Sequence, residues 1–261
     1  SGSLKVTTDI QVADGKSLTL TAEQADGLTL ESAGDLTIEG SSNTTSVDLS
    51  NITVSGNGTA VFEATDSLKL DDGTDLGNVT LNIPAGRTVT MNATDADGVT
   101  ITGGGTLALT GTFDDSIDTS GWGTPTIDLT GATLDLANDT LDLPNTSEFH
   151  LTGAQASSLT GGINGTDGDN SLVIDVSAAT GDVLYDSDTK TANLILNINT
   201  GDGIDHVTFD FGAEAGYTIK LAGSTFTFGE GEEVYDGEGK VIKGDILEIS
   251  NGSVNLSGVT F

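Results

Sequence analysis

Closely spaced aspartates recur in glycine-containing loops along this sequence, and such loops suit a calcium ion. Calcium takes about six to eight oxygen ligands from carboxylates and carbonyls, and glycine lets the backbone fold around the ion. The strongest candidates are Asp167 with Asp169 and Asp202 with Asp205, where closely spaced carboxylates occur with glycine. The other candidate ligands are Asp114, Asp115, Asp118, Asp72 and Asp75. We therefore expect calcium as a cofactor at one or more of these loops.

The charge balance supports a cation and excludes one class of partner. The 261 residues include 40 Asp plus Glu and 8 Lys plus Arg, which gives a formal net charge of -32. Such a charge opposes compaction unless salt or bound cations screen it. Nucleic acid binding needs clustered lysine and arginine, so we expect no nucleic acid partner. An anionic membrane surface is disfavoured for the same reason.

Catalytic groups have little support in this sequence. It contains no cysteine and two histidines, His150 and His206. His150 alternates with Phe149 and Leu151, which predicts a place on the polar face of a strand. Acid pairs of the kind that glycosidases use arise by chance among so many acids, and no nucleophile elbow is present. We expect a protein that is not an enzyme.

Trp122 lies between two glycines in the loop Ser120-Gly121-Trp122-Gly123. An exposed tryptophan in such a loop could contact a carbohydrate or a protein partner. Alternatively the ring folds back over the core as a plug, and we favour this second interpretation.

An internal repeat organises the first half of the chain. Residues 10–40 align without a gap with residues 81–111, so that each position matches one 71 residues later. Asp26-Gly27 matches Asp97-Gly98, and apolar positions correspond throughout. A third, shorter copy covers residues 149–159, which match 18–28. We refer to these stretches as copies 1, 2 and 3.

A second motif recurs at less regular intervals. Its copies are VDLSNITV from Val47, TDLGNVTL from Thr74, IDLTGATL from Ile127 and VNLSGVTF from Val254. Each has leucine at the third position and threonine at the seventh. The uneven spacing implies loops of different lengths between the copies.

The local pattern is that of short β-strands. Apolar and polar residues alternate over stretches such as 17–21 and 88–92, and Gly, Asp, Asn and Ser separate these stretches. Alternation of this length indicates a half-buried strand bounded by turns. Single helical turns are predicted at 21–25, 92–98 and 152–158, with Thr21 capping the first.

Two all-β architectures are compatible with this pattern. One is a parallel β-solenoid of short strands, and the other is a series of tandem β-sandwich modules. We favour the solenoid because the strands are short, aromatic residues make up 5 %, and Thr, Asn and Asp recur in register. We expect the repetitive solenoid over residues 1–183. The more aromatic residues 184–261 are expected to form a cap or a small β-domain.

The repeats resemble those of a known group of proteins. LTLTAEQADGLTLESAGDLTIEG and VTMNATDADGVTITGGGTLALTG look like repeats of bacterial surface-layer and RTX-type secreted adhesin proteins. The stretch from Thr200 to Asp205 is similar to the RTX nonapeptide, with Thr in place of the first Gly, and it occurs once here. The resemblance implies export, calcium binding and formation of arrays or adhesive fibres.

These observations together predict a structural role outside the cell. We expect a structural, self-assembling component of a bacterial cell-surface layer or extracellular fibre, assisted by calcium as the resemblance implies. The alternative is an adhesin module that binds a glycan or another surface ligand. The expected partners are identical subunits or neighbouring repeats, with cell-surface glycans as a further possibility. No stretch is apolar over the length needed to span a bilayer.

Overall fold

The chain forms two compact units, Ser1–Pro125 and Thr126–Phe261. In the computed structural model of the protein, the described residues are 10–123, 125–143, 148–165 and 170–175, together with short strands between 185 and 255. Side chains are described at 10–123, 125–141, 148–164 and 172–174.

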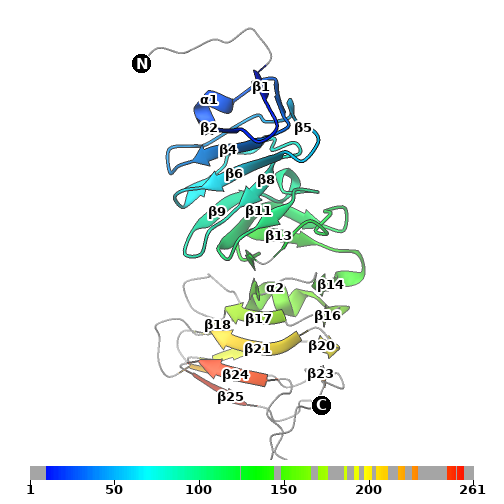
Figure 1. Ribbon diagram of the computed structural model, residues 1–261. Coiled ribbons are helices and arrows are strands. Elements are labelled where there is room, and N and C mark those ends of the chain that lie inside the picture. The colour runs from blue at the N-terminus through cyan, green and yellow to red at the C-terminus, as the bar shows by residue number, and fades with distance from the viewer. Residues whose placement is uncertain are drawn as a thin grey trace, which may run out of the picture. The chain divides into compact units, whose positions relative to one another are not determined.

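Unit 1 consists of short strands joined by tight corners (Figure 1). Its strands are β1 (Ile10–Val12), β2 (Ser17–Thr21), β3 (Leu30–Ser32), β4 (Asp35–Gly40), β5 (Ile52–Val54), β6 (Thr59–Ala64), β7 (Leu68–Lys69), β8 (Thr80–Asn82), β9 (Thr88–Asn92), β10 (Ile101–Thr102) and β11 (Thr106–Asp114).

These strands stack in parallel into three sheets. Sheet I has the order β1-β3-β5, sheet II the order β2-β4-β6-β8-β10, and sheet III contains β7-β9-β11. The pairs within each sheet are parallel. Stacked residues are 18 to 27 positions apart, from Ser17 beside Asp35 to Asp48 beside Asp75. Each such interval is one turn of a solenoid.

The alternating residues face inward and outward as the period of two requires. On β4, Leu36 and Ile38 are 1 % and 0 % exposed, whereas Asp35 and Glu39 are exposed. The next turn places Phe62 directly on Ile38, and its ring is fully buried. Burial of each such side chain contributes about 1.5–3 kcal/mol, so the interior rows hold the stack together.

The two gapless repeat copies occupy different sheets. Each copy contains two pairs of consecutive strands. In copy 1, β1 and β3 begin the pairs and belong to sheet I, and β2 and β4 follow them in sheet II. In copy 2 the first strands, β8 and β10, belong to sheet II, and the second strands, β9 and β11, belong to sheet III. The extra strand β7 in the turn between them accounts for this displacement. Copy 2 is therefore shifted around the solenoid by one sheet.

The predicted helical turns are present, and each is capped by the side chain of the residue that precedes it. In α1 (Ala22–Ala25), the Thr21 hydroxyl accepts from the Gln24 backbone N–H at 3.3 Å, and Gln24 Oε1 accepts from the Thr21 N–H at 2.9 Å. This reciprocal pair is a capping box. The corresponding stretch of copy 2 is the short 3₁₀ helix η1 (Ala93–Asp95), capped by Asn92.

The second sequence motif forms one kind of corner in the solenoid. The Ile52 N–H donates to the Leu49 carbonyl and the Val79 N–H to the Leu76 carbonyl, both at 3.0 Å. The two gapless copies make the same corner after their helical turns. There the Leu28 N–H donates to the Ala25 carbonyl, and the Val99 N–H donates to the Ala96 carbonyl. The third residue of these two corners, Gly27 or Gly98, has a positive φ of 65° or 66°. Glycine adopts this conformation readily because it has no Cβ.

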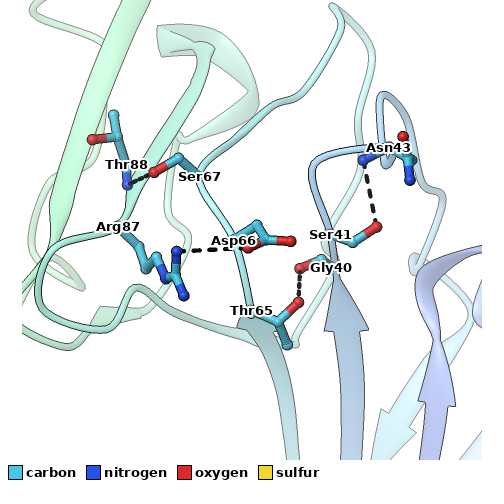
Figure 2. A network of polar contacts seen from close by, with 8 residues as sticks. All are labelled: Gly40, Ser41, Asn43, Thr65, Asp66, Ser67, Arg87 and Thr88. Carbon is cyan, nitrogen blue, oxygen red and sulfur yellow. Dashed lines mark hydrogen bonds and ion pairs between the residues drawn. The ribbon is translucent and has the colours of Figure 1, made fainter.

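Another series of corners follows β4, β6 and β8, and its polar contacts join successive turns (Figure 2). The Thr65 N–H and hydroxyl both donate to the Gly40 carbonyl at 2.8 Å. One turn further, the Thr88 N–H donates to the Ser67 hydroxyl at 2.9 Å. Arg87 lies 3.6 Å from Asp66, with both side chains about half exposed. Exposed ion pairs of this kind add little stability, so the hydrogen bonds to the backbone stabilise this corner.

Unit 2 is built in the same way. Its elements are β12 (Thr126–Asp128), β13 (Ala132–Asp135), η2 (Ala137–Asp139), β14 (Thr140–Leu143), β15 (Glu148–Thr152), α2 (Gly153–Ser158), β16 (Gly162–Gly165), β17 (Asn170–Asp175), β18 (Tyr185–Asp186), β19 (Thr191–Asn193), β20 (Asn197–Gly201), β21 (Ile204–Asp210), β22 (Tyr217–Lys220), β23 (Thr225–Phe228), β24 (Ile246–Ser250) and β25 (Gly252–Asn255).

Three ladders run through unit 2. Sheet IV contains β12-β15-β17-β21-β24, sheet V has the order β14-β16-β20-β23, and sheet VI the order β18-β19-β22-β25. Their strand pairs are parallel apart from β18 with β19. In α2, Thr152 and Gln155 form the same capping box as Thr21 and Gln24. The third helical turn predicted from the sequence is thereby confirmed.

The parallel stacking confirms the all-β solenoid, whereas a β-sandwich would pair its strands antiparallel. The prediction of a solenoid over 1–183 and a separate cap over 184–261 stays a prediction. No helix in the described part of the chain is long and apolar enough to cross a bilayer.

Candidate functional site

One exposed aspartate from each of five successive corners of unit 1 lies along a single edge of the stack. We call this set the aspartate row, and its members are Asp26, Asp48, Asp75, Asp97 and Asp118. The Gly27 N–H donates to the Asp48 carbonyl, Asp48 and Asp75 form a parallel bridge, and the Gly98 N–H donates to the Asp118 carbonyl. Asp75 and Asp97, in the middle of the row, line one pocket. Stacked strands are about 4.8 Å apart, so carboxylates on stacked turns lie close together.

Two members of the row join their turn to the next through the side chain. Asp26 Oδ1 accepts from the backbone N–H of Asp48 at 2.9 Å, and Asp97 Oδ1 accepts from that of Asp118 at 2.7 Å. Asp26 and Asp97 are the same position of the gapless repeat. The repeat therefore preserves a contact between turns at this edge.

The receiving aspartates cap their own corners. Asp48 Oδ1 accepts from the Ser50 hydroxyl at 2.6 Å and from the Ser50 N–H at 3.0 Å. These two bonds, the hydroxyl first, hold the pKa of Asp48 below its ordinary value. The Ser120 hydroxyl and N–H lower the pKa of Asp118 in the same way. Both carboxylates therefore stay ionised in mildly acidic solution.

A pocket of about 350 Å³ opens beside the middle of the aspartate row. Asp75, Asp95 and Asp97 line it, together with Thr74, Thr94 and backbone at Gly73 and Gly77. All three carboxylates already accept a backbone hydrogen bond. Asp95 Oδ2 accepts from the Gly73 N–H at 2.9 Å, Asp75 Oδ1 from the Gly77 N–H at 2.8 Å, and Asp97 Oδ1 from the Asp118 N–H at 2.7 Å. The pocket is consequently polar and strongly negative.

Several of the predicted calcium ligands lie in unit 1, and the structure gives most of them hydrogen-bonding partners. Asp75 and Asp118 belong to the aspartate row. Asp114 Oδ1 accepts from the Ser116 hydroxyl and N–H, and these bonds lower the pKa of Asp114. Asp72 accepts from the Asn92 side-chain amide at 3.1 Å, and Asp115 is exposed. These residues are distributed over separate corners.

The other predicted calcium ligands belong to unit 2. Asp167, Asp169 and Asp202 lie outside the described residues. Asp205 is on β21, next to Ile204, which pairs with Asn170 of β17. Calcium binding at these loops stays a prediction. Where side chains are described, no group of three or more His, Cys, Asp or Glu is placed to hold a metal ion.

Three members of the aspartate row were missed as candidate ligands: Asp26, Asp48 and Asp97. Two signals in the sequence could have found them. Asp26 and Asp97 are identical across the gapless repeat, and Asp48 occupies the second position of the second motif, as Asp75 does. Their spacing in sequence is wide, and stacking of the turns brings them into one line.

Trp122 is a core residue and not a surface contact. It is 4 % exposed, its ring lies 6.2 Å from that of Phe113, and its Nε1–H donates to the Ala96 carbonyl at 3.3 Å. The interpretation as a plug is confirmed. His150 lies on the outward face of β15, as predicted, with Nε2 2.7 Å from Glu148 Oε1.

No protein-family model, curated protein or solved structure matches this chain. The molecule itself offers a parallel stack with an ordered acidic edge.

Proposed function

We propose that this chain is a structural, self-assembling component of a bacterial cell-surface layer or extracellular fibre, in which calcium joins acidic edges of neighbouring subunits. The observation that carries this proposal is the aspartate row, one exposed carboxylate per turn over five turns. A solenoid built from repeats presents extended surfaces of this kind, which suit lateral contact with another long molecule.

The charge of the chain supports a role for cations in that contact. At a net charge of -32, two copies repel each other unless counter-ions lie between them. Calcium accepts carboxylate and carbonyl oxygens in flexible geometry, so an ion between two aspartate rows can take ligands from both. The lowered pKa values of Asp48 and Asp118 keep these ligands charged. The resemblance to surface-layer and RTX-type proteins supports an extracellular location.

Electron microscopy and sedimentation of the 261-residue chain, with calcium and with a chelator, test the proposal. We expect laterally associated assemblies in calcium that dissolve when the ion is removed. The informative variant is Asp75→Asn with Asp97→Asn, which removes two charges from the row. Asparagine keeps a side-chain oxygen that can accept the Gly77 and Asp118 N–H bonds. We expect at least a tenfold higher calcium concentration to be needed for association.

The matched control is Asp14→Asn with Asp35→Asn, two exposed positions outside the row. Its net charge equals that of the row variant, so diffuse screening would affect both alike. Assembly that is insensitive to calcium, or a control that loses as much as the row variant, would contradict the proposal.

An adhesin that binds a glycan is the second candidate, and the pocket beside the row favours it. Aspartate and threonine side chains at Asp75, Asp95 and Thr94 can hydrogen-bond sugar hydroxyls. Glycan-array binding by the chain in chelator, lost in Asp95→Ala and retained in Asp35→Ala, would support this role. Binding of no glycan would leave it without support.

A further inference from the structure

The corner between β5 and β6 carries an asparagine followed directly by a glycine, Asn57-Gly58. The Gly58 N–H donates to the Ser55 carbonyl at 3.0 Å, and this bond closes the corner. Asn57 is exposed, and in the part of the chain that the structure describes no hydrogen bond engages its side chain. Its carboxamide is therefore free to turn toward the backbone that follows it.

Stacking on the previous turn requires glycine at position 58. A Cβ atom on Gly58 would lie 2.9 Å from the Gly34 carbonyl oxygen and closer still to the Ser32 carbonyl oxygen. Backbone atoms cannot yield to contacts this short, so any other residue would push the two turns apart. The nitrogen that follows Asn57 therefore belongs to the residue type that has no side chain to shield it.

Two other asparagines of unit 1 provide an internal comparison. Asn51 and Asn78 hold the same position of the second motif, and both are exposed. They precede Ile52 and Val79, which are 0 % and 1 % exposed. A β-branched residue is stiff and crowds its own backbone nitrogen. The three asparagines therefore share exposure, whereas the unhindered neighbour belongs to Asn57.

We propose that Asn57 is a site of spontaneous deamidation, at which the stack gains a negative charge and a lengthened backbone. The Gly58 nitrogen forms a bond to Asn57 Cγ, the bond from Cγ to Nδ2 breaks, and ammonia leaves with the proton from the Gly58 nitrogen. Water then opens the cyclic imide on either side of this nitrogen. Cleavage at Cγ gives aspartate, and cleavage at the main-chain carbonyl carbon gives isoaspartate, whose backbone runs through Cβ and Cγ. Each conversion consumes a water molecule and releases an ammonia molecule.

Isoaspartate disturbs the stack because Asn57 lies between two anchors to the previous turn. The Ser55 N–H donates to the Ser32 carbonyl at 2.9 Å, and the Thr59 N–H donates to the Gly34 carbonyl at 3.0 Å. An isoaspartate adds a carbon atom to the backbone between these two bonds, so both cannot keep their present geometry. Aspartate leaves the backbone unchanged and adds charge alone.

Peptide mapping by mass spectrometry measures the conversion. The 261-residue chain is incubated at neutral pH, and conversion is followed at each asparagine over time. We expect Asn57 to convert at least about tenfold faster than Asn51 and Asn78, because the residue after it has no side chain. The control Asn57→Gln keeps an exposed amide but must close a larger ring, so this position should stay unconverted over the same period. Conversion at Asn57 no faster than at Asn51 would overturn the proposal.

Hydrogen exchange measures the effect on the stack. The isoaspartate form is separated from the aged chain and identified by enzymatic methylation of its free α-carboxylate. Asn57→Asp is the matched control, because it carries the same charge on an unchanged backbone. The Ser55 and Thr59 amides should exchange at least about tenfold faster in the isoaspartate form than in this control. The Thr106 amide, which donates to the Arg87 carbonyl in another turn, should exchange equally in both.

Equal exchange of the Ser55 and Thr59 amides in the two proteins would overturn the proposed effect on the stack. The reaction needs neither calcium nor a second copy of the chain. The incubation is therefore carried out in dilute solution with a chelator present, so that its outcome is independent of the self-assembling role proposed above.

Discussion

Asp97 accepts a 2.7 Å hydrogen bond through Oδ1 from the backbone N–H of Asp118, one turn further along the solenoid. The same bond joins Asp26 to Asp48 in the other gapless repeat copy. In each case a carboxylate accepts a hydrogen bond from the backbone of the next turn, and the donating residue is itself an aspartate. The hydrogen bond offsets part of the repulsion that stacking two acids creates.

Substitution at Asp97 separates the two effects. Asp97→Ala removes the acceptor and should lower the free energy of unfolding by about 0.5–1 kcal/mol, as expected for one exposed hydrogen bond. Asp97→Asn keeps an acceptor oxygen and removes a charge, so its stability should equal or exceed that of the wild type. Urea unfolding followed by circular dichroism measures both. Equal losses in the two variants would show that charge, and not the bond, matters here.

The lowered pKa of Asp48 depends on Ser50. Ser50→Ala removes the 2.6 Å hydroxyl bond, so the pKa of Asp48 should rise toward its ordinary value. Because the folded-state pKa is below the unfolded one, Asp48 adds stability above the unfolded value and loses it as the pH falls through the folded value. Ser50→Ala shrinks that contribution. Carboxyl chemical shifts in an NMR titration give the pKa, and Asp118 in the same spectra should be unchanged.

The two equivalent glutamines should differ in their effect on stability. Gln155→Ala leaves the carbonyls of Leu129 and Ala132 without this donor and opens the α2 capping box, so it should cost about 2–3 kcal/mol. Gln24→Ala loses the capping contact alone and should cost less than about 1 kcal/mol. Thermal unfolding of both variants in dilute solution, where subunits are separate, provides the comparison. A larger loss for Gln24→Ala would contradict the assigned contacts.

Trp122 is the single tryptophan, so its fluorescence reports its surroundings directly. A ring that is 4 % exposed should emit at short wavelength and resist quenching by acrylamide until the chain unfolds. Trp122→Ala should cost about 3 kcal/mol because it leaves a cavity beside Phe113. An emission maximum typical of a solvated indole would rule out the buried position.

The fold could be predicted from the sequence because its signals are local and repeated. Alternation over 17–21 and 88–92 becomes β2 and β9 with the same boundaries, and the Thr21–Gln24 spacing becomes a capping box. Short strands that stack in register need no long-range pattern beyond the repeat itself.

The arrangement around the axis could not be predicted in the same way. The two residues of β7 carry no alternation that marks them as a strand, yet they begin a new sheet and displace copy 2 by one sheet. Likewise, aspartates that lie close in sequence, such as Asp114 and Asp118, serve separate corners. An Asp followed two residues later by Ser or Thr, as at Asp48, Asp114 and Asp128, indicates corner capping and could have distinguished them.

The one-sheet displacement of copy 2 also bears on how this chain has diversified. A duplicated segment usually displays its outward residues twice in the same direction, so that both can be selected for one ligand. Here Thr19 of β2 and Thr90 of β9 hold the same place in the repeat but belong to sheets II and III. Side chains at matching positions of the two copies therefore have different neighbours on the surface. The outward residues of the copies can differ in chemistry while their buried residues stay alike.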